Sequence, residues 1–144
     1  MASKVFINLP VKDLNKSIEF FKKLGYSFNE QFTDETAACL VISEEIYAML
    51  LTHDKFKEFI VNPIADATQV TQVINALSVD SKEAVNEIAD KALNAGATAV
   101  KEPLDYGFMY SRLFADLDGH YWEFFWMDPN YVHQPVEEAA TSTN

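Results

Sequence analysis

One carboxylate on an aromatic strand is the side chain best placed to do chemistry. The alternation over Tyr121–Met127 predicts a strand on which Tyr121, Glu123 and Phe125 share one face. An ionised carboxylate among aromatic rings is costly unless it takes up a proton or finds a cation. Glu123 is therefore a candidate ligand anchor or general base, and the alternative is a half-exposed glutamate without a role.

Arg112, the only arginine in the chain, is the natural partner for this carboxylate. It precedes the Glu123 strand in a predicted hairpin that turns at Asp118-Gly119, so it can lie directly opposite or diagonal to Glu123 if both side chains face the cleft. Its planar guanidinium suits Glu123 or an acidic ligand. A structural ion pair, with Glu123 or Asp105, is the alternative. Tyr110 has the same parity as Arg112 and is expected on the same face.

The other reactive residue types are isolated in the sequence. None of the three histidines has a partner at metal-binding spacing. Cys39 is the only cysteine, which excludes an internal disulfide and a cysteine-cluster zinc site. We interpret Cys39 as a buried free thiol and expect a reducing, cytoplasmic environment.

Charge and hydropathy exclude two classes of partner. The chain has 22 acidic and 11 basic residues among 144, a net charge of −11. This balance leaves no basic stripe for phosphates or anionic lipid, so we expect no nucleic-acid or membrane-surface partner. No apolar run approaches the roughly 18 residues of a membrane span, and no signal-peptide pattern opens the chain.

The first half of the chain predicts a βαβββ module at about residues 4–55. Alternating apolar residues over 5–11 predict a strand, and Asp13 and Gly25 are typical of the N-cap and the end of the helix that follows. Three strand-like runs complete the module, over 27–31, 37–42 and 47–52.

The pattern then repeats after a linker at about residues 56–70. Residues 71–130 predict a second βαβββ module, with Ser81 as N-cap and Gly96 at the helix end, and Leu9 corresponds to Leu77 at an offset of 68 residues. Each module leaves one sheet face uncovered. We therefore predict an α+β fold, a single domain over 1–130 whose two tandem modules form a curved mixed sheet around a shared cleft. Residues 131–144 are predicted to be a frayed tail.

Two segments carry a resemblance to a known superfamily: INLPVKDLNKSIEFFKKLGYSF near the start and ADLDGHYWEFFWMDP near the end. With the repeat, they resemble the vicinal oxygen chelate proteins, which include glyoxalases, bleomycin-resistance proteins and extradiol dioxygenases. The segments DETAACLVISEEIYAMLLTH and DYGFMYSRLFADLDGH are similar to a bacterial branch of lactoylglutathione-lyase-like proteins.

The resemblance implies where a metal would bind. Its ligand positions fall on Phe6, about Leu50, about Ile74 and Glu123, and only Glu123 can coordinate an ion. We therefore expect no metal cofactor, although the superfamily commonly uses a divalent ion. The predicted function is binding of a small molecule in a metal-free cleft. The residues expected to line this cleft are Phe6, Asn8, Leu50, Ile74, Tyr110, Arg112, Tyr121, Glu123 and Phe125.

Two other functions remain open from sequence. One is a glyoxalase-like lyase or isomerase that uses Glu123 as general base, with or without a divalent metal. The other is an interaction module whose acidic surface is the functional part. Because two modules share one chain, the cleft can form within the chain or by exchange in a homodimer.

Overall fold

The computed structural model describes residues 3–131; the predicted tail beyond Tyr131 lies outside the described residues. The first module and the helix that follows it comprise β1 (Val5–Val11), α1 (Leu14–Lys23), β2 (Ser27–Asn29), the 3₁₀ helix η1 (Glu30–Phe32), β3 (Ala37–Val41), β4 (Ile46–Thr52) and α2 (His53–Lys57). The second comprises β5 (Ile74–Ser78), α3 (Lys82–Asn94), β6 (Thr98–Ala99), β7 (Leu104–Asp105), β8 (Met109–Ala115) and β9 (Tyr121–Met127).

Each module forms its own mixed sheet, which confirms the predicted α+β fold of two βαβββ units. The strand orders are β1-β4-β3-β2 and β5-β9-β8-β6, with β7 added to β8. In both sheets the first strand runs parallel to the last, and the other pairings are antiparallel. Three details differ from the prediction: the modules form two sheets and not one continuous curved sheet, β2 ends at Asn29, where η1 begins, and the short strand β7 was not expected.

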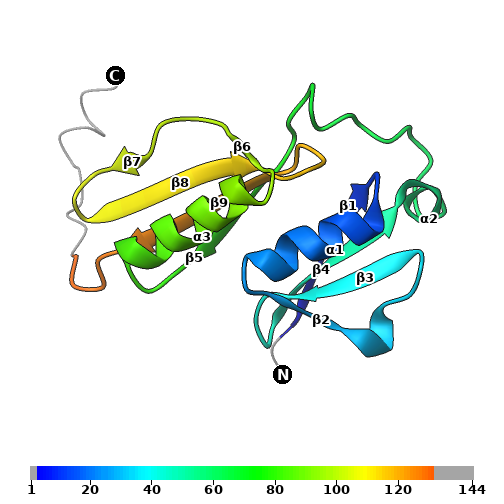
Figure 1. Ribbon diagram of the computed structural model, residues 1–144, viewed down its shortest axis with the longest axis horizontal. Helices are drawn as coiled ribbons and strands as arrows, with labels where there is room; N and C mark the ends of the chain where they lie inside the picture. The colour runs from blue at the N-terminus through cyan, green and yellow to red at the C-terminus, as the bar shows by residue number, and fades with distance from the viewer. Residues whose placement is uncertain (1–2, 132–144) are drawn as a thin grey trace, which may run out of the picture.

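The helices begin where the sequence predicts. The Asp13 carboxylate accepts a hydrogen bond from the Lys16 amide at 3.1 Å, and the Ser81 hydroxyl accepts one from the Ala84 amide at 3.0 Å. Both bonds satisfy amide groups that a helix N-terminus leaves without a partner. Figure 1 shows α1 and α3 in front of the strands, so both helices cover the same side of the sheets.

One hydrophobic core joins the two modules between the helices and the sheets. Phe20 and Phe21 of α1 make edge contacts with Phe114 of β8 and Trp122 of β9, at ring-centroid distances of 6.4 and 5.3 Å. Leu50 also belongs to this core. Full burial of a side chain of this size contributes about 1.5–3 kcal/mol. The helix of one module therefore stabilises the sheet of the other.

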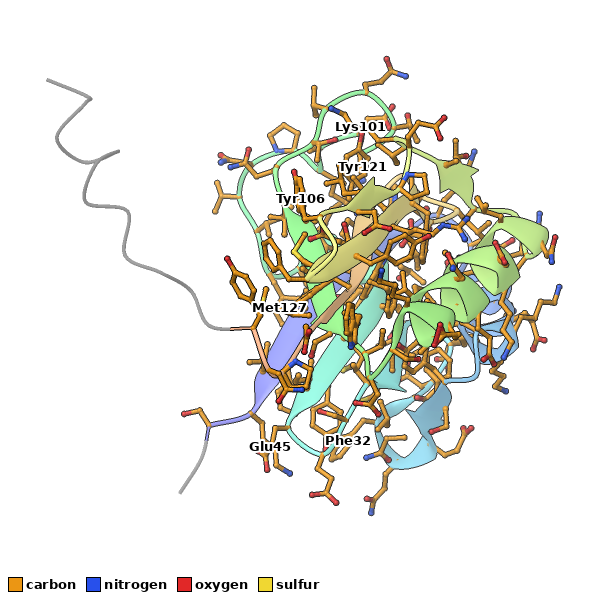
Figure 2. The ribbon with its side chains drawn as sticks, turned by 90° about the vertical axis from the view of Figure 1, so that its left-hand side faces the viewer. Phe32, Glu45, Lys101, Tyr106, Tyr121 and Met127 are labelled. Atoms are coloured by element: carbon orange, nitrogen blue, oxygen red, sulfur yellow. The ribbon has the colours of Figure 1, made fainter. Side chains whose placement is uncertain are left out.

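The opposite faces of the two sheets carry no helix, and we call them the open faces. Phe6 of β1 and Tyr47 of β4 stack on the first open face, with ring centroids 4.8 Å apart. On the side of the sheets away from the helices, Figure 2 shows Met127 at the end of β9. Phe6 and Ile74 are 49% and 53% exposed. No helix in the described part of the chain is long and apolar enough to cross a membrane.

The β8–β9 turn ties the second module to the start of the first. Asp118 accepts a hydrogen bond from the Lys12 amide at 2.7 Å, and the His120 ring donates from Nε2 to the Pro10 carbonyl at 2.7 Å. Within the turn, Asp116 is buried and accepts from Trp122 Nε1 at 2.9 Å. Residues over 100 positions apart are thereby held together at one end of β1.

Candidate functional site

Glu123 lies on the open face of the second sheet, as its parity predicts. Its neighbours in β9, Trp122 and Phe124, belong to the core on the helix side, so Glu123 points the other way. It pairs with Leu113 of β8 and Ala76 of β5. The carboxylate is half-buried and makes no hydrogen bond or ion pair with the residues that the structure describes.

Arg112 does not partner Glu123, and that prediction is wrong. The β8–β9 register places Arg112 opposite Phe124, on the face covered by α3. There its guanidinium donates to Asp90 at 2.8 Å and to Asn86 Oδ1 at 3.1 Å. Arg112 does share a face with Tyr110, as predicted. The register of the hairpin, however, differs by one residue from the register that would pair Arg112 with Glu123.

Tyr110 follows Arg112 onto the helix side. Its hydroxyl donates to Asn86 Oδ1 at 2.7 Å, so Asn86 accepts from both residues. Tyr110 and Arg112 therefore bind α3 to β8 and do not line the open face. The spacing of Asn86 and Asp90, four residues apart on one helix face, is the sequence signal that could have indicated this contact.

Leu50 is also misplaced by the prediction, because it is fully buried in the core beneath α1. In β4 it is Met49 that has the parity of the open face, and it pairs with Asn8 of β1. Phe6 and Asn8 lie on the open face of the first sheet, where the Asn8 amide donates to the Phe6 carbonyl at 3.0 Å.

The remaining predicted residues gather around Glu123. Ile74 pairs with Tyr121 across β5 and β9, and Tyr121 and Phe125 flank Glu123 along β9. The predicted residues thus form two groups on different sheets, Phe6 with Asn8 and Ile74 with the β9 residues. The side chains next to the Glu123 carboxylate on this face are therefore aromatic and aliphatic.

The donor set does not fit the metal of the superfamily. Among residues 3–131, no group of three or more histidine, cysteine, aspartate or glutamate side chains could hold a metal ion. Phe6 and Ile74 offer no lone pair, Leu50 lies in the core, and a catalytic ion commonly needs about three protein ligands. No finding favours the lyase or isomerase that uses Glu123.

Two reactive groups, Cys39 and Asp116, lie away from the open face, and burial raises the pKa of both. Burial raises the pKa of the Cys39 thiol, which is 1% exposed, so it stays protonated and is a poor nucleophile. Burial also raises the pKa of Asp116, against the opposing effects of His120 and of the Trp122 hydrogen bond. Neither group has a place in a reaction at Glu123.

A cavity that the sequence did not indicate lies under the linker between α2 and β5. It has a volume of about 560 Å³, and Tyr121 is the only residue of the predicted site among those that line it. The apolar residues of the linker have no regular spacing, so its sequence does not predict a cavity. The wall forms only because the β8–β9 turn and the end of β1 meet there.

The comparisons with known proteins agree with this architecture. Residues 4–43 match the family described as "Bleomycin resistance protein-like N-terminal". A hypothetical protein of Staphylococcus aureus, SA1046, is 30% identical, with a TM-score of 0.73 over 87% of this chain and 94% of that one. No curated protein matches the chain.

Two more distant structures share the fold. An enzyme of the glyoxalase/bleomycin resistance protein/dioxygenase family from Burkholderia phytofirmans is 18% identical, with a TM-score of 0.72 over 88% of this chain and 99% of that one. The fosfomycin resistance protein FosX from Listeria monocytogenes is 19% identical, with a TM-score of 0.64 over 96% of this chain and 98% of that one.

This chain and the solved structures share one fold. It consists of tandem βαβββ modules, each with one sheet face covered by a helix and one open face. The chain has the fold of the glyoxalase/bleomycin resistance protein/dioxygenase structures, and its residues 4–43 match the bleomycin resistance protein-like N-terminal family. The comparisons do not single out the lactoylglutathione-lyase-like branch.

Proposed function

We propose that this protein binds a small molecule on the open face around Glu123 without a metal ion. The observation that carries the proposal is the half-buried Glu123 carboxylate, which has no partner among the described residues and lies between Tyr121 and Phe125. Such a carboxylate gains most from a cation or an N–H donor, and the rings gain from a flat apolar body. The ligand therefore combines a positive or hydrogen-bond-donating group with an apolar or aromatic body.

The names of the relatives supply two contrasting probes. Bleomycin is a cationic molecule with an aromatic tail, whereas fosfomycin is a small anion. The Glu123 carboxylate favours the cation over the anion at this face. We expect metal-free bleomycin to bind and fosfomycin not to bind.

Calorimetric titration and thermal unfolding in the presence of a chelator test this proposal. Metal-free bleomycin is expected to raise the melting temperature, because a ligand that binds only the folded state stabilises it. Glu123→Gln should weaken binding about tenfold, the effect of losing one charge-assisted hydrogen bond.

Glu45→Gln provides the matched control, because it removes the same charge from the exposed β3–β4 turn. Its affinity should equal that of the unaltered protein. Absence of binding at millimolar bleomycin, binding only after a divalent ion is added, or equal affinity of Glu123→Gln would each contradict the proposal.

We also propose that the open faces are completed in a homodimer. Three apolar side chains on these faces, Phe6, Ile74 and Met127, are 47–53% exposed, and such surfaces commonly mark an interface. Light scattering should give about twice the chain mass of 16.3 kDa, and Ile74→Asp should return the protein to that mass. A mass of one chain at about 100 µM protein would refute the dimer.

The proposed location is the cytoplasm. The support for it is Cys39, a buried free thiol that a reducing compartment keeps unoxidised.

A further inference from the structure

The cavity under the linker, which we call the linker cavity, has the size and walls of a small-molecule site. Its volume of about 560 Å³ lies within the usual range for such sites. The walls include Leu9 and Pro10 of β1, Ile60, Ile64 and Val70 of the linker, and Tyr121 of β9. In Figure 1 the linker arches from α2 to β5 beside the β8–β9 turn.

The linker is held in place by direct backbone packing. A Cβ atom at Gly119 would lie 2.7 Å from the Ala67 carbonyl carbon and from the Thr68 amide nitrogen, so the turn and the linker touch without an intervening side chain. The Asp66 carboxylate accepts from the Thr68 amide at 3.0 Å, which orders the linker locally. The β8–β9 turn therefore supports the linker directly at Ala67 and Thr68.

The linker walls leave apolar surface uncovered. Val61, Val70 and Val73 all line the cavity, yet they are 101%, 60% and 56% exposed. Covering such apolar side chains with an apolar body removes them from water and so lowers the free energy. The occupant of the linker cavity is thus expected to present an apolar surface.

A second, more polar cavity of about 690 Å³ adjoins the first and shares Pro10, Ile64 and His120 with it. Lys12 and Lys57 line it, and the side-chain ammonium group of neither is in an ion pair within residues 3–131. The acidic residues there each accept two hydrogen bonds: Asp66 from the Thr68 amide and hydroxyl, and Asp118 from the Lys12 amide and the Ser17 hydroxyl. The Lys12 and Lys57 ammonium groups make no hydrogen bond within the described residues, and such donors suit an anion.

We propose that the two adjoining cavities form a second ligand site, for a molecule with an apolar body and a carboxylate head, such as a medium-chain fatty acid. The body lies in the linker cavity against the exposed valines. The carboxylate accepts hydrogen bonds from Lys12 and Lys57 in the polar cavity. This site shares Tyr121 with the open face around Glu123, but Glu123 does not line it, and it takes a ligand of opposite charge.

Calorimetry with decanoate, decanol and decylamine tests the chemistry of the site. Decanoate should bind with a dissociation constant below about 1 mM, and decanol and decylamine at least about fivefold more weakly. Absence of decanoate binding would overturn the site itself. Equal binding of decanol would overturn the role of the carboxylate head.

Variants locate the ligand. Lys57→Gln should weaken decanoate binding about fivefold, while Lys55→Gln, on the same helix but paired with Glu58, should leave it unchanged. Val70→Asp should weaken it about tenfold or more, and Val5→Asp, a valine of similar exposure outside the cavity, should not.

Glu123→Gln separates this proposal from the proposed function. It should leave decanoate binding intact, since Glu123 lines neither cavity. Two results would place the ligand elsewhere and refute the linker site. One is an equal loss of decanoate affinity in both members of a lysine or valine pair, and the other is loss of decanoate binding in Glu123→Gln.

Discussion

Replacement of Gly119 by alanine is expected to destabilise the protein by about 2–5 kcal/mol. Two costs combine at this position. Gly119 has a φ of 90°, which an alanine adopts only with strain. The new Cβ would also lie 2.7 Å from backbone atoms of Ala67 and Thr68, so the linker must move away from the β8–β9 turn. Chemical denaturation monitored by tryptophan fluorescence measures the loss.

Gly25→Ala is the matched control for this prediction. Gly25 has a φ of 105°, but a Cβ there would meet nothing within 4 Å. It therefore tests backbone strain alone, with an expected cost of about 1 kcal/mol. Gly119→Ala should also lose decanoate binding, while Gly25→Ala should retain it. Equal costs in the two variants would show that the linker yields to the Cβ without resistance.

Replacement of Asp116 by alanine is expected to cost about 2–4 kcal/mol, the second large effect. The carboxylate accepts from Trp122 Nε1 at 2.9 Å, from the His120 amide at 3.0 Å and from the Asp118 amide at 2.9 Å. Alanine leaves these donors without an acceptor, and the Trp122 side chain is 1% exposed. A buried donor without a partner costs about 1–3 kcal/mol.

Two comparisons show whether the Trp122 bond carries this cost. Asp128→Ala removes a carboxylate that accepts from the Asn130 amide at the surface, and it should cost below about 1 kcal/mol. In a Trp122→Phe background, Asp116→Ala should cost about 1 kcal/mol less than in the unaltered protein. Strictly additive costs would contradict the assignment to Trp122.

The loss of folding stability in Asp116→Ala should also depend on pH. Because burial raises the pKa of Asp116, the native state binds this proton more tightly than the unfolded state does. That contribution to stability is fully present below the unfolded-state pKa and is lost as pH rises through the higher native pKa. The difference in stability between the unaltered protein and Asp116→Ala should therefore be larger at about pH 4 than at about pH 7.

Local patterns predicted the elements of the fold well. Asp13 and Ser81 cap helices, Gly25 and Gly96 follow them at positive φ, and the apolar alternation of 5–11 and 121–127 matches β1 and β9. These features depend on residues within a few positions of one another. The sequence contains all the information they need.

Contacts between elements were harder to predict. Arg112 and Glu123 are suitable partners by chemistry, but a register with Leu113 opposite Glu123 places them on opposite faces. Alternation shows which residues share a face within one strand and not which of the two faces a helix will cover. Leu50 was assigned to the cleft by the resemblance, as an approximate position, and it lies in the core, where Met49 has the parity of the open face instead.

By itself, the amino-acid sequence determined the duplicated α+β architecture and the aromatic setting of Glu123, since these follow from residue type and short-range period. The lack of metal-ligating types at the superfamily's positions is what the resemblance implied. Only the tertiary structure decided that Arg112 binds α3 and that a cavity forms beneath the linker. Both depend on contacts between segments that are far apart along the chain. Packing of α3 on β8, and of Gly119 on Ala67, brings these segments together.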